Sequence, residues 1–108
     1  INLRIARALE TLQQLLITHT RTQDLIFVDA DKPNYEAYYE LCLQLLKPNG
    51  ILILDNIFLN GRVLTDSMDK KTATTIRALN QKISCDPRVD ITVLPIGDGM
   101  TLIRKRES

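Results

Sequence analysis

Apolar residues recur along the chain at spacings that alternate between those of helices and those of strands. Between residues 6 and 17 they return at every third or fourth position, which predicts an amphipathic helix. Residues 24–29, DLIFVD, form a short unbroken apolar run between two aspartates, which is typical of a strand buried on both faces. The first four residues, INLR, are expected to be the end of a strand that precedes the helix.

A second helix and a second strand follow in the same alternation. The helix is predicted from Tyr35 onward, since Pro33 suits its first turn and KPNG at 47–50 supplies helix-stop residues. Its inward positions are Tyr35, Tyr38, Tyr39, Cys42, Leu45 and Leu46. We interpret the tyrosines as helix core and rim rather than as a stacking platform. Residues 51–55, ILILD, predict another buried strand.

The C-terminal part adds a helix and a hairpin. Residues 72–84 predict the helix, and residues 91–105 predict two strands joined by a tight turn, where Gly97 and Gly99 supply positive φ. Pro95 indicates that the first of these strands ends there or lies at the sheet edge. Because the connection between the two buried strands is long enough for a right-handed crossover, they are expected to be parallel. The chain is thus predicted to be one α/β domain with parallel strands and a closing antiparallel hairpin.

Composition and charge exclude some classes of function. Hydrophobic residues make up 44% and charged residues 25% of the 108 positions, as in ordinary globular proteins. A formal net charge of +1 argues against nucleic-acid binding, which needs a basic face. Since no apolar run approaches the roughly 18 residues of a membrane span, we expect no membrane partner. Cys42 is expected to be buried and reduced, which fits a cytoplasmic protein.

Two aspartates stand at the ends of the predicted parallel strands. Asp29 ends one strand and Asp55 ends the next, and ligands of open α/β sheets bind at this edge. If the strands are neighbours, they lie only about 4.8 Å apart, so the two carboxylates would repel unless a cation sits between them. Asn56 adds a neutral oxygen beside Asp55. An all-oxygen set of this kind suits Mg²⁺, Mn²⁺ or Ca²⁺.

Lys32 follows Asp29 closely enough to take part in chemistry at the same edge. A nearby divalent cation would lower the pKa of its ammonium group, and the lysine could then act as general base toward a hydroxyl that the metal also acidifies. In the competing interpretation the strand-end aspartates only cap loops and Lys32 is a surface charge.

Two other function classes compete with a metal-assisted hydroxyl chemistry. One is phosphoryl transfer: D-x-D after a buried strand is typical of haloacid-dehalogenase-type phosphatases, but Pro33 stands where they carry Thr or Val. Receiver domains also gather carboxylates and a lysine, but they need an acidic pair after their first strand. The other class is a catalytically inactive structural or dimerisation protein.

Three stretches carry a family resemblance: DLIFVDADKPNYEAYY, LLKPNGILILDNIFLNGRV and DPRVDITVLPIGDGMTLIRK. In this order they resemble the metal-dependent O-methyltransferases typified by caffeoyl-CoA and catechol O-methyltransferases. With LRIARALETL at the start, the resemblance covers nearly the whole chain. It implies a Rossmann-like, seven-stranded S-adenosylmethionine-binding sheet and transfer of the sulfonium methyl group to a phenolic hydroxyl.

The resemblance also implies roles for particular residues. The metal ligands would be Asp29, Asp55 and Asn56, and Lys32 would be the base or orient the hydroxyl. Ala8 falls where the family contacts the adenine end of the cofactor, and Asp29 and Asp31 also lie on the cofactor side. Leu59 stands where plant members carry a tryptophan, and residues 66–80 lack the tyrosines that those enzymes use. The acceptor is therefore expected to be small and catechol-like, as in bacterial-type members.

The chain departs from the family most in its length, because family members are about twice as long as this chain. The chain would be the C-terminal half of the methyltransferase domain, without the half that carries the cofactor-binding loop. Its strands would be the third to the seventh of the family's sheet, so the stub at INLR would lack a partner and the strand at residues 24–29 would expose an edge. We therefore expect weak cofactor binding by the isolated chain, and self-association, for example as a homodimer.

Overall fold

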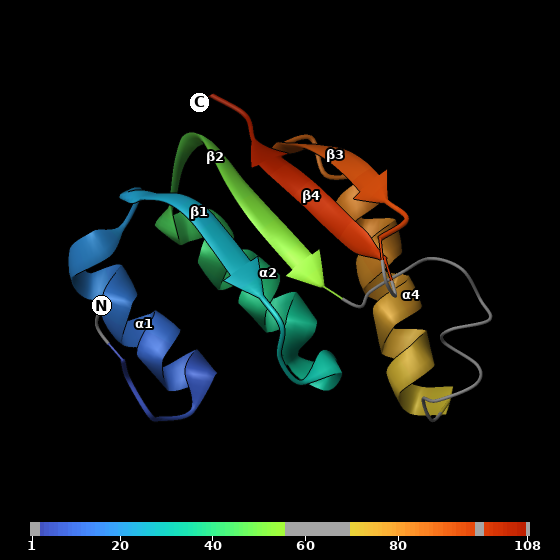
Figure 1. Ribbon diagram of the computed structural model, residues 1–108, viewed down its shortest axis with the longest axis horizontal. Helices are drawn as coiled ribbons and strands as arrows, with labels where there is room; N and C mark the ends of the chain where they lie inside the picture. The colour runs from blue at the N-terminus through green and yellow to red at the C-terminus, as the bar shows by residue number, and fades with distance from the viewer. Residues whose placement is uncertain (1–2, 56–69, 97–98, 108) are drawn as a thin grey trace.

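The computed structural model describes residues 3–55, 70–96 and 99–107, and it has the α/β architecture that the sequence predicts (Figure 1). Its elements are α1 (Ala8–His19), β1 (Gln23–Val28), a short 3-10 helix η1 (Lys32–Asn34), α2 (Tyr35–Leu45), β2 (Leu46–Asp55), α4 (Lys70–Ser84), β3 (Val89–Leu94) and β4 (Met100–Lys105). The sheet order is β1-β2-β4-β3. β1 and β2 are parallel, while β4 is antiparallel to both of its neighbours, which confirms the crossover and the closing hairpin.

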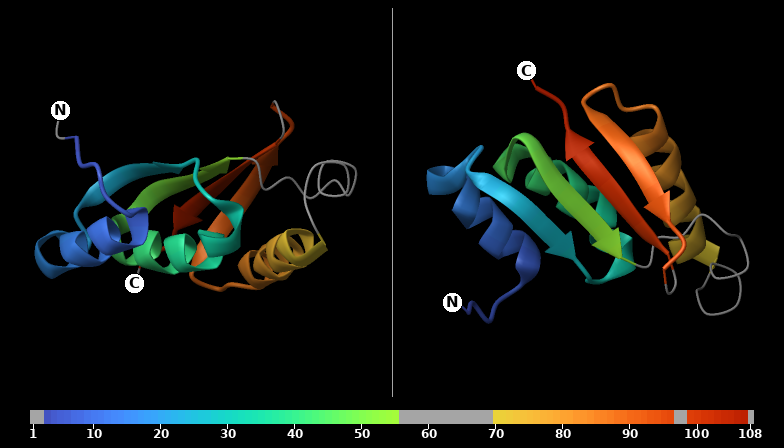
Figure 2. Two further views of the ribbon diagram at one scale, coloured as in Figure 1. Left: turned by 90° about the horizontal axis from the view of Figure 1, so that it is seen from below. Right: turned by 45° about the horizontal axis from the view of Figure 1, so that its top comes forward.

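The helices lie on one face of this sheet (Figure 2). The core between the two layers combines the apolar positions of α2 and α4 with Val28, Leu52, Leu54 and Ile103 from the strands. Cys42 lies in this core as a free thiol, and burial raises its pKa to about 12, so it stays protonated and unreactive. No helix among the described residues is long and apolar enough to span a membrane.

Two predicted elements differ in the structure. Leu3 and Arg4, the described part of the expected N-terminal stub, belong to no strand. α2 ends at Leu45, close to KPNG as predicted, but the next strand begins at Leu46 and not at Ile51, so the four residues lie inside β2. The reason is a bulge, since Gln23 pairs with Leu46 but Leu25 pairs with Ile51, and Asn49 adopts a φ of 69° within the extra residues.

The hairpin at the C-terminal end follows its sequence prediction. β3 is the outer strand of the sheet and ends at Leu94, directly before Pro95. Gly99 has a φ of 99°, as the turn requires. Gly97, the other glycine of the predicted turn, lies outside the described residues.

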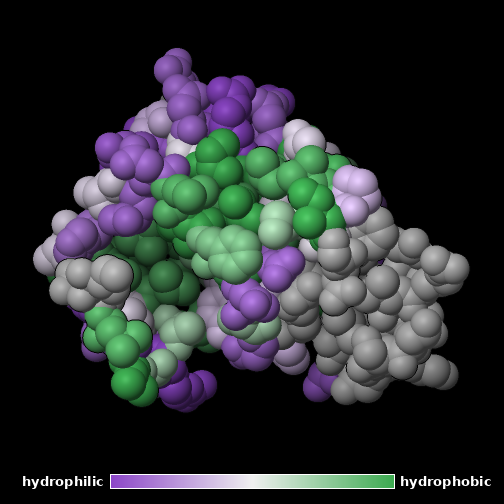
Figure 3. All heavy atoms as spheres, in the orientation of Figure 1, coloured by the Kyte–Doolittle hydropathy of each residue, from purple (hydrophilic) through white to green (hydrophobic). Residues whose placement is uncertain are grey.

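The opposite face of the sheet carries no helix among the described residues. Strand alternation places Leu25 and Phe27 of β1 and Ile51 and Ile53 of β2 on this open face, and Leu25 and Phe27 are 59% and 52% exposed. Apolar side chains gather across its centre (Figure 3). β1 is the outermost described strand on its side, so the expected exposed edge is present. Because parallel strands are normally covered on both faces, this surface is unusual for a finished domain.

A polar cluster joins the turn before β3 to α2. Asp86 accepts hydrogen bonds from the Tyr39 hydroxyl at 2.7 Å and from the Arg88 guanidinium at 2.6 Å. Arg88 also donates to Glu40 of α2 at 2.9 Å, and Lys82 of α4 lies 2.8 Å from the same carboxylate. Arg88 holds the pKa of the Asp86 carboxyl well below its usual range, so Asp86 is ionised in the folded chain.

Replacing Asp86 with asparagine is expected to lower the free energy of unfolding at pH 7 by about 1.5–3 kcal/mol, because the charge-assisted bonds from Arg88 are lost. The folded-state pKa of Asp86 lies below its unfolded value of about 3.9, so this stabilisation is complete above that pH and declines as the pH falls further. Urea unfolding of both proteins at pH 7 and pH 3 measures the effect. An equal difference at both pH values would contradict a role for the carboxylate charge.

Candidate active site

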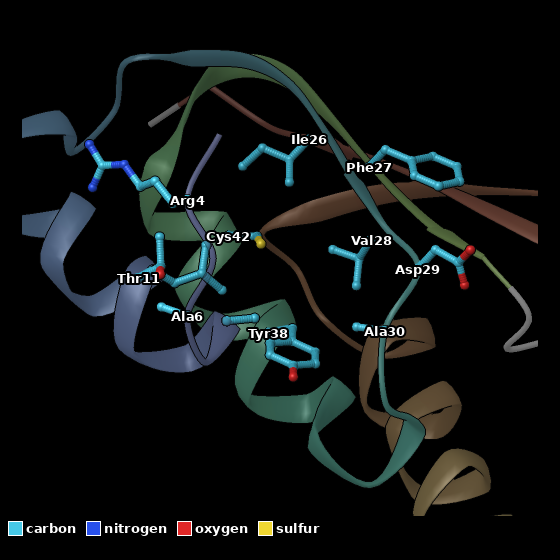
Figure 4. A pocket seen from close by; sticks show the side chains of 12 residues that line it. Arg4, Ala6, Thr11, Ile26, Phe27, Val28, Asp29, Ala30, Tyr38 and Cys42 are labelled. Carbon is cyan, nitrogen blue, oxygen red and sulfur yellow. The ribbon is translucent and has the colours of Figure 1, made fainter. Parts of the chain in front are cut away.

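Asp29 and Asp55 lie side by side at the carboxyl ends of β1 and β2. Val28 is paired with Leu54 in the parallel register, so the residues that follow them are neighbours at one sheet edge. Both side chains alternate onto the open face; Figure 4 shows Asp29 on the same side of β1 as Phe27. Asp29 is exposed and Asp55 is half-buried. The condition for a shared carboxylate site, neighbouring parallel strands, is therefore met.

The hydroxyl of Tyr35 links the backbones of these two strand ends. Tyr35 is fully buried as the first residue of α2. Its hydroxyl donates to the Asp55 carbonyl at 3.0 Å, with the Val28 carbonyl at 3.4 Å, and it accepts a hydrogen bond from the Ala30 N–H at 3.1 Å. The sequence marked Tyr35 as an inward helix position, and nothing in the pattern indicated this polar role.

Asp31 is held in the loop between β1 and α2. Its carboxylate accepts hydrogen bonds from the Tyr38 hydroxyl and from the Asn34 side-chain amide. The Tyr38 bond, followed by the Asn34 bond, lowers the pKa of Asp31, so this carboxylate is charged. Burial, together with Asp31, raises the pKa of Tyr38 to about 12, so the tyrosine remains a donor. Asp31 is thus a fixed anionic acceptor at the surface.

Two hollows adjoin this edge of the sheet. The larger, of about 300 Å³, lies between the segment before α1, α1 itself, β1 and α2, and its lining includes Ala8, Asp29 and Tyr38 (Figure 4). The smaller, of about 170 Å³, is lined in part by Arg7, Ala8, Asp31 and Tyr38. The three residues predicted on the cofactor side therefore lie around adjacent hollows, and Tyr38, which was predicted as helix core and rim and not as a site residue, lines both.

Part of the predicted site falls beyond what the structure describes. Lys32 begins η1, directly after Asp31, but its side chain is outside the described part, and so are Asn56 and Leu59. Within residues 3–55, 70–96 and 99–107, no three His, Cys, Asp or Glu side chains gather as a metal cluster. Of the predicted metal ligands, only Asp29 and Asp55 lie within these described residues. The metal role of Asp29, Asp55 and Asn56 and the role of Lys32 therefore stay predictions.

Comparisons with known proteins identify the family. A family model described as O-methyltransferase matches residues 1–106. A probable caffeoyl-CoA O-methyltransferase of Dictyostelium discoideum is 46% identical over 107 residues, which span 97% of this chain and 46% of that protein. A catechol O-methyltransferase domain-containing protein of Mus musculus is 45% identical over 106 residues, 97% of this chain and 40% of its own length.

A solved structure agrees with this assignment. The O-methyltransferase of Bacillus cereus in complex with SAH superposes with a TM-score of 0.75 and 33% identity, over 92% of this chain and 47% of that one. The chain thus spans about half the length of the relatives that it matches. The motifs, the strand order and these similarities converge, and the chain belongs to the O-methyltransferase family.

Proposed function

We propose that this chain forms part of an S-adenosylmethionine-dependent, divalent-metal-dependent enzyme that methylates a hydroxyl of a small catechol-like or phenolic acceptor. The observation that carries the proposal is the pairing of Asp29 and Asp55 at the ends of neighbouring parallel strands, next to a hollow that Ala8 lines. Family membership supports the reaction type, and the relative from Bacillus cereus was solved with SAH.

The side chains at the strand ends fit a hard divalent cation. Two carboxylates on adjacent strands repel each other, and a cation between them removes this repulsion. Their oxygens suit Mg²⁺, Mn²⁺ or Ca²⁺, and Asn56 would add a third oxygen ligand. When bound, such a cation lowers the pKa of an acceptor hydroxyl that it contacts. Asp29 and Asp55 would hold the cation, and Lys32 would accept the proton of the hydroxyl.

The cofactor would lie along the two hollows beside β1. Ala8 lines both of them, and its methyl group leaves most of the space open. Asp31 presents a charged carboxylate whose oxygens are already oriented by Tyr38 and Asn34, so its remaining lone pairs can accept hydrogen bonds from a ligand. Asp29 contributes to the lining of the larger hollow from the β1 side.

We also propose that the chain acts as the C-terminal half of a methyltransferase domain. Its relatives are about twice as long, the open face of the sheet carries exposed Leu25 and Phe27, and β1 offers an edge to a further parallel strand. A second half that brings a strand and apolar helices would cover all of these surfaces. Without it, two copies of the chain would associate through the open face.

The test of this function is methyl transfer from S-adenosylmethionine to a panel of small catechols and caffeoyl-CoA by the full-length protein that carries this chain. We expect turnover of a small catechol that is lost when a chelator removes the metal and restored by Mg²⁺ or Mn²⁺. Lys32→Ala should abolish turnover as well. Turnover that persists in the chelator would contradict the metal requirement. Phosphatase activity without S-adenosylmethionine would favour phosphoryl transfer.

A further inference from the structure

Three tyrosines of α2 bury their rings and send each hydroxyl to a different partner. Tyr35, Tyr38 and Tyr39 are at most 4% exposed. Tyr38 bonds to Asp31 and Tyr39 bonds to Asp86, both through side-chain carboxylates. Tyr35 is different, because its hydroxyl bonds to backbone groups at the ends of β1 and β2.

Those backbone groups belong to Asp55 and to the two sequence neighbours of Asp29. Val28 and Ala30 stand on either side of Asp29, and a bond of 3.0 Å runs from the Tyr35 hydroxyl to the carbonyl of Asp55 itself. The paired register of β1 and β2 ends at Val28 and Leu54. The Tyr35 hydroxyl therefore supplies a link between the strands just where the ladder between them stops.

A hydrogen-bonded link at this point opposes the electrostatic repulsion between the two carboxylates of the site. Two carboxylates on neighbouring strand ends repel each other when no cation lies between them, which favours a wider spacing of these ends. A metal site tolerates ligand displacements of only about 0.5 Å before it loses affinity. A hydroxyl that bonds to the backbones of both strands therefore preserves the spacing of Asp29 and Asp55 that a cation needs.

We infer that Tyr35 is a positioning residue that sets the spacing of Asp29 and Asp55 for a divalent cation; this inference rests on the function proposed above. Tyr35 acts through the backbone and not as a ligand, since its hydroxyl is engaged with Ala30 and Asp55. Its ring is held by an edge-to-face contact with Tyr38, at a centroid distance of 6.0 Å. Removing only the hydroxyl should therefore leave the ring, and the packing of α2, in place.

Tyr35→Phe tests the inference, and Tyr39→Phe is its matched control. Both variants lose one buried hydroxyl of α2, but Tyr39 bonds to Asp86 in the cluster before β3 and not to the strand ends. The probe is Mn²⁺, titrated into the 108-residue chain by calorimetry and electron paramagnetic resonance. We expect Tyr35→Phe to weaken Mn²⁺ binding by about 10–100-fold, as for groups that orient metal ligands, and Tyr39→Phe to leave it unchanged.

Amide hydrogen exchange supplies a second readout that needs no metal. The Ala30 N–H donates to Tyr35, so its exchange should become faster in Tyr35→Phe and stay the same in Tyr39→Phe. Equal Mn²⁺ affinity in Tyr35→Phe and the unsubstituted chain would overturn the inference and leave the proposed metal site standing. An equal loss in both variants would also overturn it, because general destabilisation would then be the cause. Absence of Mn²⁺ binding in the unsubstituted chain would overturn the proposed metal role together with this inference.

Discussion

Replacing Asp55 with alanine is expected to lower metal-dependent methyl transfer by the full-length protein at least about 100-fold, since even groups that only orient metal ligands are worth about 10–100-fold. Asp55 ends the inner strand β2 and stands beside Asp29, whereas the nearby carboxylate of Asp31 is already bonded to Tyr38 and Asn34. The cation would lose one of two charged ligands, and with it the means to acidify the acceptor hydroxyl. Initial rates at saturating Mg²⁺, compared with Mn²⁺ affinity, measure the effect.

The matched control for this variant is Asp24→Ala. Asp24 belongs to the neighbouring strand β1 and lies at the opposite end of the sheet, where its exposed carboxylate pairs with Lys47 at 3.0 Å. Exposed pairs contribute little, so Asp24→Ala should keep both the rate and the fold while it changes the net charge by the same amount. Undiminished turnover in Asp55→Ala would remove the proposed metal role of this residue.

The carboxylate pair was predictable because it depends on two features that a sequence displays directly. Asp29 and Asp55 each end an unbroken apolar run, and such runs predict buried strands. The connection between them is long enough for a helical crossover, so the strands were expected to be parallel and their ends to share an edge. The same reasoning predicted α2, α4 and the final hairpin, with element ends that differ by a few residues.

The tyrosine hydroxyls were not predictable in this way. Periodicity placed Tyr35, Tyr38 and Tyr39 on the inward face of their helix, which is correct, but it reports which side a residue faces and not which atom its oxygen meets. Tyr35 bonds to a carbonyl 20 positions away and Tyr39 to a carboxylate 47 positions away. Such contacts depend on how the helix docks on the sheet, and this docking is a property of the folded chain.

The bulge in β2 was missed for a related reason. KPNG has the composition of a helix stop and a turn, and local propensity alone favours a loop. In the structure the segment is drawn into the sheet because Gln23 pairs with Leu46 before the apolar run begins. Gly50 then sits where an added Cβ would lie 3.1 Å from the Gln23 carbonyl oxygen, which explains a glycine at this place. Pairing with β1 thus outweighed the local preference of KPNG for a turn.

The isolated 108-residue chain is expected to bind S-adenosylmethionine at least about 100-fold more weakly than the full-length protein does. The larger hollow is bounded by α1, β1, α2 and the segment before α1, and Phe27 of its lining is 52% exposed. A covering half would close this space and add polar contacts to a charged ligand. Two such contacts, at about 1.5–3 kcal/mol each, amount to at least a hundredfold in affinity. Calorimetric titration of both proteins measures the difference.

Sedimentation of the same chain, taken together with cofactor binding, separates a half-domain from a dimerising protein as the explanation of the open face. If that face needs a second half of the domain, the isolated chain should self-associate, and Phe27→Ser should reduce this association because it removes an exposed aromatic ring from the patch. Ile17→Ser is the matched control, since Ile17 is 82% exposed but lies on α1 and not on the open face. Ordinary cofactor affinity in a strictly monomeric chain would contradict the half-domain proposal. If the isolated chain forms a stable dimer and the full-length protein never binds cofactor, the chain would instead be a structural, dimerising member of the family. The open face would then be the surface that its function uses.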